Sequence, residues 1–126
     1  MQLISTPNAP KPIGHYAQAV VSGGLIFVSG QLAFDPKTGD KITQSIEEET
    51  VQVLANVEAI LEAAGAGRSS VVKATVYLSD MSFWAQVNQV YAAFFGSHTP
   101  ARAIVPIKEL PAGFRIEVEV VGEVSA

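Results

Sequence analysis

The sequence predicts an α+β fold of two layers, in which one mixed β-sheet carries two helices on one face. Two observations support this prediction: short runs rich in β-branched and aromatic residues alternate with two segments whose apolar residues recur every three or four positions. The expected order of elements is β-β-β-α-β-α-β-β. The length of 126 residues fits a single domain over residues 1–126, since domains cluster at about 100–150 residues.

The first part of the chain is predicted to be extended. Three prolines among residues 7–12 favour an extended arm, because each fixes its own φ angle and disfavours helix at the preceding residue. Two β-rich runs follow, Tyr16–Ser22 and Leu25–Gln31, and the two glycines between them are typical of a hairpin. Residues 35–39, with proline and glycine, predict a turn.

Two helices are predicted next. The first begins at Ser45, whose side chain can cap the backbone, and ends at Gly65. The second begins after Asp80, runs to about Phe95 and ends at Gly96. Their expected buried stripes are Ile46, Val53, Leu54, Val57, Ile60, Leu61 and Ala64 in the first helix, and Trp84, Val87, Tyr91 and Phe94 in the second.

Three more strands are predicted, at Val71–Leu78, Ala101–Ile107 and Phe114–Val124. Pro106 indicates that its strand lies at an edge or stops early. The last strand alternates, with apolar side chains facing one way and Arg115, Glu117 and Glu119 the other. The outward residues of 71–78 are mostly apolar, so we expect the face without helices to pack on other subunits.

The composition points the same way. Charged residues make up 16% of the chain, against about 25% in an average domain, so part of the surface is expected to be buried between copies. The net charge of −4 disfavours a nucleic-acid backbone as partner. No cysteine is present, which excludes disulfides and thiolate chemistry. With no leader pattern and no long apolar run, we expect a cytoplasmic protein without membrane contact.

Few polar residues stand out as candidates for chemistry. Arg102 enters an apolar strand, which is consistent with a salt bridge to Glu117 or Glu119, with an exposed edge position, or with a clamp for a substrate carboxylate. The two glutamates are consistent with a solvated strand face or, in a subunit cleft, with acid–base chemistry.

Other candidates are ordinary when taken singly. Tyr16 begins a strand, Ser29 precedes a glycine where the backbone could approach a ligand closely, and Asn88 lies in the middle of a helix. The chain has only two histidines, so no metal site is expected.

Ten short segments carry a pattern that is specific in combination. They are residues 13–16 (IGHY), 28–31 (VSGQ), 35–39 (DPKTG), 56–57 (NV), 62–65 (EAAG), 72–76 (VKATV), 87–88 (VN), 93–95 (AFF), 100–102 (PAR) and 116–119 (IEVE). The Ser-Gly-Gln and Pro-Ala-Arg segments are the most specific when they occur together. Across essentially the whole chain, the sequence resembles the RidA/YjgF family of reactive-intermediate (enamine/imine) deaminases.

The resemblance implies a chorismate-mutase-like fold, a homotrimer with clefts between subunits, and hydrolysis of 2-imino acids or their enamine tautomers to 2-keto acids and ammonia without a cofactor. Arg102 then corresponds to the residue that pairs with the substrate carboxylate, and Glu117 to the one that holds the attacking water. Tyr16, Ser29 and Asn88 would line the cleft, and the backbone N–H of Ile104 would help to hold the carboxylate.

Three features depart from the family pattern. His15 stands where proline is common, Ile104 replaces a frequent cysteine, and the segment from Phe95 to Pro100 is shorter by roughly three residues. Two other functions stay open: a non-catalytic trimer that binds a small 2-keto or amino acid and regulates a partner, and a ribonuclease or translation inhibitor, which the net charge disfavours.

Overall fold

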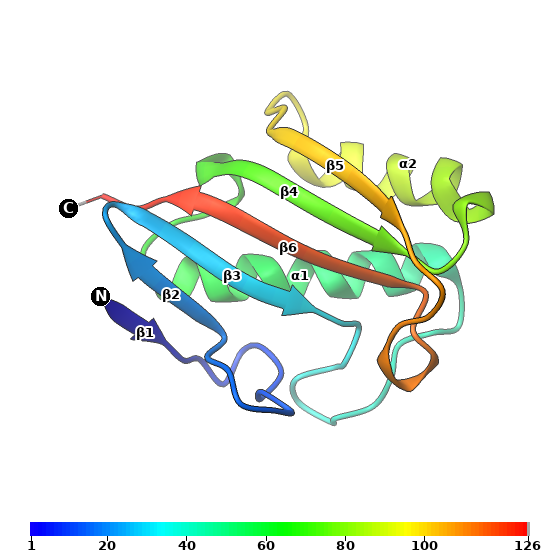
Figure 1. Ribbon diagram of the computed structural model, residues 1–126, viewed down its shortest axis with the longest axis horizontal. Helices are drawn as coiled ribbons and strands as arrows, with labels where there is room; N and C mark the ends of the chain where they lie inside the picture. Colours follow the sequence, from blue (N-terminus) through cyan, green and yellow to red (C-terminus); the bar gives the residue numbers. More distant parts are fainter. Residues whose placement is uncertain (126) are drawn as a thin grey trace.

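Six strands form one sheet in the order β1-β2-β3-β6-β4-β5 (Figure 1). The computed structural model describes residues 1–125. Neighbouring strands are antiparallel, except that β4 and β5 are parallel. The elements are β1 (Gln2–Ile4), β2 (Ala19–Ser22), β3 (Leu25–Gln31), α1 (Ile46–Ala63), β4 (Val71–Leu78), α2 (Trp84–Phe95), β5 (Ala101–Pro106) and β6 (Ile116–Glu123).

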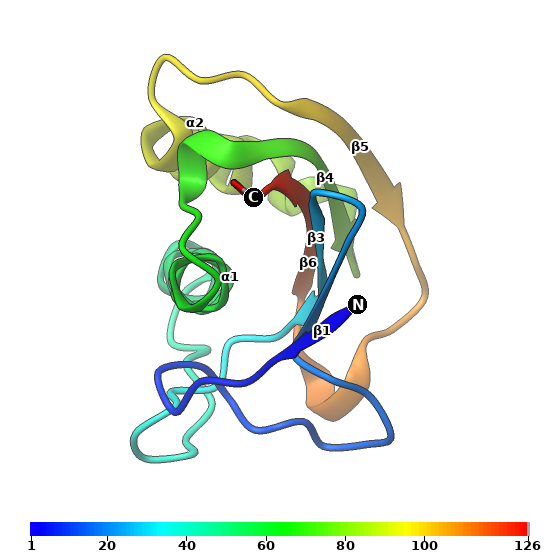
Figure 2. The same ribbon diagram turned by 90° about the vertical axis from the view of Figure 1, so that its left-hand side faces the viewer.

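Both helices lie on the same face of the sheet, which Figure 2 shows edge-on. α1 packs against β3, β6 and α2, and nine of its residues are buried, including Val53, Leu54 and Ile60. Ser45 caps this helix by accepting a hydrogen bond from Glu48 N at 3.0 Å. The predicted two-layer α+β fold and its element order are therefore confirmed.

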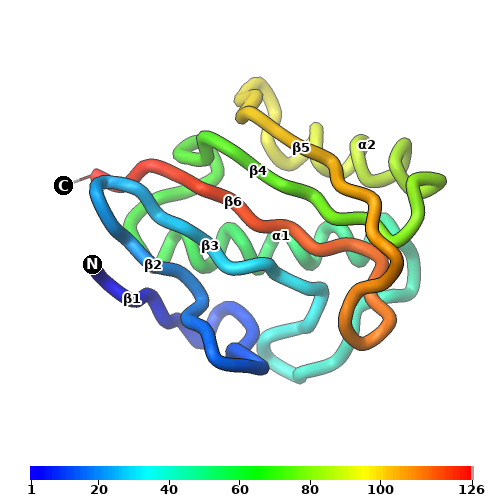
Figure 3. The backbone as a smooth tube through the Cα atoms, in the orientation of Figure 1, coloured from blue at the N-terminus to red at the C-terminus, as the bar shows by residue number. Residues whose placement is uncertain are grey.

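The N-terminal region differs from the prediction in its strand boundaries. The second strand begins at Ala19 rather than Tyr16, because the buried Gln18 side chain bonds to the arm instead, with Thr6 N donating to Oε1 at 2.7 Å and Nε2 donating to Pro10 O at 2.9 Å. β1 begins and β6 finishes at the same end of the sheet in Figure 3, where β6 lies beside the turn that joins β2 and β3. Val124 N donates to Gly24 O at 3.0 Å there.

The last two strands are shorter than predicted. β6 begins at Ile116 and not at Phe114, since a 3₁₀ turn over Pro111–Gly113 leads into it. β5 ends at Pro106 and lies at the edge of the sheet, so both expectations drawn from this proline are confirmed.

The fully buried residues of α2 are Val87, Tyr91 and Phe95, whereas Trp84 and Phe94, which were predicted in the buried stripe, are only partly buried against the core. Phe94 instead stacks on the Arg68 guanidinium, whose Cζ lies 4.1 Å from the ring centroid. Asp80 caps a short 3₁₀ turn, Met81–Phe83, that precedes the α-helix.

The face without helices is mixed rather than mostly apolar. On β4 a register shift between Val71 and Lys73 leaves both Val72 and Lys73 exposed, and Thr75 and Tyr77 follow half-buried. Phe27 on β3 is 46% exposed at the same face. Within residues 1–125, no helix is long and apolar enough to span a bilayer.

Candidate active site

A bulge in β3 creates the first of two polar hollows. The pairing of β3 with β6 shifts between Val28 and Gln31, so Ser29 and Gly30 leave the regular ladder. Glu117 on β6 fills the space above Gly30: a Cβ built there would lie 2.8 Å from both Cδ and Oε2 of the glutamate. Bulges re-aim side chains near active sites, and only glycine leaves room for this carboxylate.

The Glu117 carboxylate is half-buried, and no hydrogen-bond donor on residues 1–125 reaches it. Burial raises the pKa of the Glu117 carboxyl above its ordinary value, and the charge of Glu119 raises it further. Glu119 itself accepts a hydrogen bond from the Tyr77 hydroxyl at 2.7 Å. Glu117 is therefore the carboxylate on this face that is left available to hold a water or exchange a proton.

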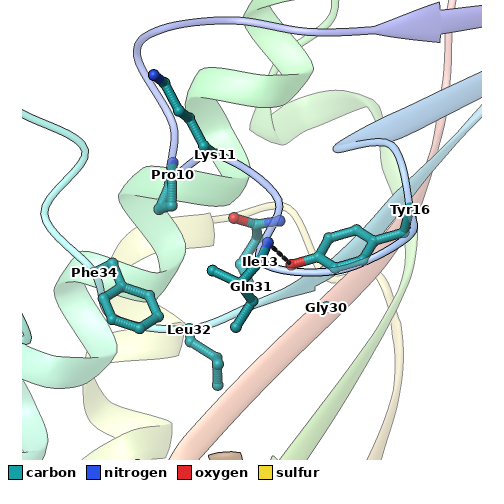
Figure 4. A pocket seen from close by; sticks show the side chains of 8 residues that line it. All are labelled: Pro10, Lys11, Ile13, Tyr16, Gly30, Gln31, Leu32 and Phe34. Atoms are coloured by element: carbon teal, nitrogen blue, oxygen red, sulfur yellow. Dashed lines mark hydrogen bonds between the residues drawn. The ribbon is translucent and has the colours of Figure 1, made fainter. Parts of the chain in front are cut away.

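Two hydroxyls lie beside Glu117, and each has one protein partner. Ser29 Oγ donates to Ala17 O at 2.7 Å, which leaves its lone pairs free. Tyr16 OH accepts from Ile13 N at 3.2 Å, the dashed line in Figure 4, which leaves its proton free. These residues line a hollow of about 250 Å³ with Ile13, Gly30, Leu32, Pro111 and Glu117.

The second hollow lies at the other edge of the sheet and contains Arg102. Arg102 Nη1 donates to Asn88 Oδ1 at 2.9 Å, and the guanidinium lies over the rings of Trp84 and Tyr91 at 4.7 and 4.9 Å. No carboxylate in the described part of the chain is within salt-bridge distance. Of the alternatives left open for Arg102, the salt bridge to Glu117 or Glu119 is therefore excluded within one chain, and the exposed position on an edge strand is observed. The remaining N–H groups are free to bind a carboxylate in bidentate fashion.

The loop before β5 forms the wall of this second hollow. The second hollow has a volume of about 350 Å³ and is lined by Asn88, Tyr91, Ala92, Gly96, His98, Thr99, Pro100 and Arg102. The shortened segment from Phe95 to Pro100 thus borders Arg102.

No group of three or more potential metal-ligating side chains occurs within residues 1–125.

Ile104 lies two residues beyond Arg102, and its side chain packs against the core. Ile107 N donates to Leu78 O on β4 at 2.9 Å. Successive N–H groups of a strand point to opposite sides, and the N–H of Ile107 points to β4. By this alternation the N–H of Ile104 points away from β4, to the open edge of the sheet. Pro106, which has no N–H group, stands at a position that faces the same open edge. A backbone donor is therefore available at the open edge of β5, the strand that carries Arg102.

The predicted site residues fall into two sets on opposite faces of the sheet. Residues paired across neighbouring strands point to the same face of the sheet. Arg102 pairs with Ala74, which is fully buried on the helix side, whereas Glu117 pairs with Tyr77 on the open face. Tyr16 and Ser29 accompany Glu117, and Asn88 and Ile104 accompany Arg102. One chain does not bring its own Arg102 and Glu117 together.

Sequence reasoning missed several residues of these hollows. Trp84 and Tyr91 were predicted only as core, although Trp84, Asn88 and Tyr91 recur at spacings of four and three, which places all three on one helix face beneath Arg102. Ile13, Leu32 and Pro111 carried no signal, because their grouping depends on the bulge and on the 3₁₀ turn.

Fold and site define a class of protein: a two-layer α+β chain with an unpaired arginine and an unpaired carboxylate in separate surface hollows. A family described as Endoribonuclease L-PSP matches residues 6–124. A RutC family protein of Pyrococcus horikoshii is 48% identical over 120 residues, covering 95% of both chains. A 2-iminobutanoate/2-iminopropanoate deaminase of Bos taurus is 44% identical over 120 residues, covering 95% of this chain and 88% of the other.

Solved structures agree with this similarity. RidA from an Antarctic Psychrobacter superposes with a TM-score of 0.95 at 40% identity, covering 98% of this chain and 100% of the other. Escherichia coli TdcF with bound serine superposes with a TM-score of 0.95 at 34% identity, covering 99% and 100%. The chain belongs to the RidA/YjgF family and has its chorismate-mutase-like fold.

Proposed function

We propose that this protein hydrolyses reactive 2-imino acids and their enamine tautomers to 2-keto acids and ammonia, in clefts between the subunits of a cytoplasmic homotrimer. The observation that carries the proposal is the pair of unsatisfied groups: Arg102 without a carboxylate partner and Glu117 without a donor. Relatives named as deaminases of 2-iminobutanoate and of reactive intermediates support it.

The overall reaction is R–C(=NH)–COO⁻ + H₂O → R–CO–COO⁻ + NH₃. Arg102 and the N–H of Ile104 bind the carboxylate. Glu117 takes a proton from water as the oxygen bonds to the imine carbon, and passes this proton to the imine nitrogen to give a carbinolamine. The hydroxyl proton of the carbinolamine then moves by way of Glu117 to the amino nitrogen. The C–N bond breaks, its electron pair leaves with ammonia, and the C=O bond of the keto acid forms.

The raised pKa of Glu117 suits this role, because a general base works best when its pKa lies near the operating pH. An imine carbon is already electrophilic, so holding the substrate next to an oriented water supplies much of the rate advantage. Tyr16 can donate its free proton, and Ser29 can accept a hydrogen bond, at the reacting group.

The separation of the two hollows supports the proposed assembly. Arg102 and Glu117 of one chain lie on opposite faces of its sheet, so a cleft that contains both takes them from two chains. The open sheet face, with Phe27 46% and Val72 40% exposed, offers a surface for the contact. A closed ring of three would then hold three equivalent clefts.

A second candidate is a regulatory trimer that binds a small ligand without turnover. The bound serine in the structure of Escherichia coli TdcF favours it, since an amino acid offers the same carboxylate to Arg102. Turnover separates the two candidates.

The deciding experiment generates imines with an amino-acid oxidase and lets semicarbazide compete to trap them. We expect the wild type to suppress trapping and Arg102→Ala to abolish the suppression. Glu117→Gln should lower kcat more than it weakens binding. Arg68→Ala is the control, because Arg68 pairs with Glu58 away from both hollows. Full activity of Arg102→Ala would show that Arg102 is not needed to bind the substrate carboxylate.

The same variants test the cleft between chains. Arg102→Ala and Glu117→Gln should each be inactive alone. When unfolded and refolded together in equal amounts, they should regain about a quarter of wild-type activity, since each such cleft needs one intact half from each of two chains. No regain from a refolded mixed trimer would contradict a shared cleft.

A further inference from the structure

A buried asparagine on α1 is bonded to the segment that leaves β3 beside the Glu117 hollow. We propose that Asn56 is a positioning residue for Glu117: it fixes the end of β3 and thereby the spacing between Gly30 and the Glu117 carboxylate. Asn56 is 1% exposed and lies on the helix side of the sheet, so it acts through the backbone and does not touch substrate. Its effect on catalysis rests on the proposed function.

The amide of Asn56 is bonded at both of its ends. Nδ2 donates to Leu32 O at 3.0 Å and to Phe34 O at 2.9 Å. Oδ1 accepts a hydrogen bond from Gln52 Nε2 at 2.9 Å, one helical turn earlier. This bond fixes which end of the amide faces β3, since an amide nitrogen only donates and an amide oxygen only accepts. Both N–H groups of the amide therefore hold the chain directly after β3.

The held segment begins just beyond the bulge in β3. Pairing with β6 is interrupted after Val28 and returns at Gln31, so the bulge needs an anchor on its far side. Leu32 supplies that anchor through its bond to Asn56, and it also lines the hollow of Glu117. The Glu117 carboxylate lies so close to Gly30 that a Cβ there would come within 2.8 Å of it. A displacement of the segment is therefore passed on to the carboxylate.

The same helix also holds the other side of the hollow. Glu49 accepts hydrogen bonds from Arg115 N at 2.7 Å and from Ile116 N at 3.2 Å. These are the two residues directly before Glu117. Glu49 and Asn56 are seven residues apart, about two helical turns, so both side chains leave the same face of α1. α1 thus fixes both strands that enclose the carboxylate, from the opposite face of the sheet (Figure 2).

The kinetic test is Asn56→Ala in the imine assay. We expect kcat to fall about tenfold, less than the loss of about 100-fold for a displacement of about 1 Å. KM should stay near the wild-type value, because the substrate carboxylate is bound by Arg102 in the other hollow. If Asn56→Ala does not fold, Gln52→Leu replaces it, since it removes the bond that orients the amide, and kcat should fall by a smaller factor with KM again unchanged.

Thr50→Val is the matched control for this test. Thr50 is as buried as Asn56, and its Oγ1 donates to Ile46 O at 2.7 Å within α1. The variant loses a buried hydrogen bond of the same helix but leaves the segment after β3 untouched, so it should keep wild-type kcat. Wild-type kcat in the Asn56 or Gln52 variant, or an equal loss in Thr50→Val, would overturn the inference.

A double-mutant cycle tests the placement without any turnover. Gly30→Ala puts a Cβ against the Glu117 carboxylate, so it should lower the free energy of unfolding. This loss should be smaller in the Asn56→Ala background, or in Gln52→Leu, because the released segment can move away from the carboxylate. It should be unchanged in the Thr50→Val background.

The cycle also separates the two proposals. Mutations at sites without shared contacts usually add in their effects on stability, so full additivity of Gly30→Ala with Asn56→Ala would overturn the placement by Asn56. Coupling to Asn56 and not to Thr50, in a protein that hydrolyses no imine, would support the placement and contradict the proposed function.

Discussion

Two glutamates on opposite sides of the sheet show how burial and pairing separate a structural carboxylate from one available for chemistry. Glu49, on α1, is fully buried and satisfied: Arg115 donates to it from Nε at 2.8 Å and from its backbone N at 2.7 Å, and Ile116 N adds a third bond at 3.2 Å. Glu117, on β6, is half-buried and has no such donor.

The two arginines repeat the contrast. Arg115 binds Glu49 and also donates to Thr43 O at 2.9 Å, so it ties the start of β6 to the segment before α1. Arg102 has an amide oxygen and two aromatic rings around it, which orient the guanidinium, and no carboxylate of residues 1–125 pairs with it. Paired charges thus stabilise the fold, whereas the guanidinium of Arg102 keeps N–H groups that these residues do not pair.

The largest effect is expected for Glu49→Ala. Removing one partner of a buried ion pair leaves Arg115 and two backbone N–H groups unsatisfied, so the free energy of unfolding should fall by about 3–5 kcal/mol. Chemical denaturation measures this change. Glu47→Ala, at an exposed position in the same helical turn, is the control and should change stability by less than about 0.5 kcal/mol. An equal loss of unfolding free energy in Glu49→Ala and Glu47→Ala would contradict the structural role assigned to the Glu49–Arg115 pair.

An intermediate effect is expected for Gly30→Ala. The added Cβ would come within 2.8 Å of the Glu117 carboxylate and displace it. Displacement of a reacting group by about 1 Å can cost about 100-fold, so kcat in the imine assay should fall by about that factor. Gly67→Ala provides the control, because nothing lies within 4 Å of a Cβ at Gly67. Wild-type kcat in Gly30→Ala would mean that Glu117 does not need its present position.

The smallest effect concerns the dependence of stability on pH. Burial and the charge of Glu119 raise the pKa of the Glu117 carboxyl above its reference value of 4.5. The folded chain therefore binds this proton more tightly than the unfolded chain does. Stability from this group is fully present below the unfolded pKa and is lost as pH rises through the folded pKa.

Glu117→Gln should remove this loss, so the variant should unfold at higher denaturant concentration than the wild type at neutral pH. Glu123→Gln, at the exposed end of the same strand, should keep the wild-type pH dependence. Unfolding curves measured from pH 4 to pH 8 compare the two. A steeper loss of stability with rising pH in Glu117→Gln would reverse the sign that burial predicts.

Much of the fold could be predicted because local signals and tertiary structure agree. The Ser45 cap and the recurrence of apolar residues along α1 are compatible only with a helix that begins at this residue and buries one face. The alternation of apolar and polar residues along β6 is compatible only with a strand that buries one face. Predictions failed where a distant contact decides the outcome. Gln18 forms hydrogen bonds to Thr6 and Pro10, so β2 begins after it. Phe94 stacks on the Arg68 guanidinium and is therefore not part of the fully buried stripe.

The candidate site was predictable residue by residue but not as an arrangement. Arg102 and Glu117 were found as polar residues in apolar strands, and the resemblance to a family supplied their roles. Their location on opposite faces depends on the register of β5 and β6 against β4, which pairs Arg102 with Ala74 and Glu117 with Tyr77. The buried role of Glu49 could not be predicted, since no local pattern shows that Arg115, far along the chain, reaches it.

The position of β6 has a consequence for how the chain is made. This strand is the last in the sequence, yet it lies between β3 and β4 in the sheet (Figure 1). A ribosome releases the N-terminal strands first, and pairing between distant segments is the slow part of folding. Until residues 116–123 emerge, the strands before α1 and those after it have no partner in common. Glu117 therefore arrives with the strand that closes the sheet, after the residues that line the Arg102 hollow have been made.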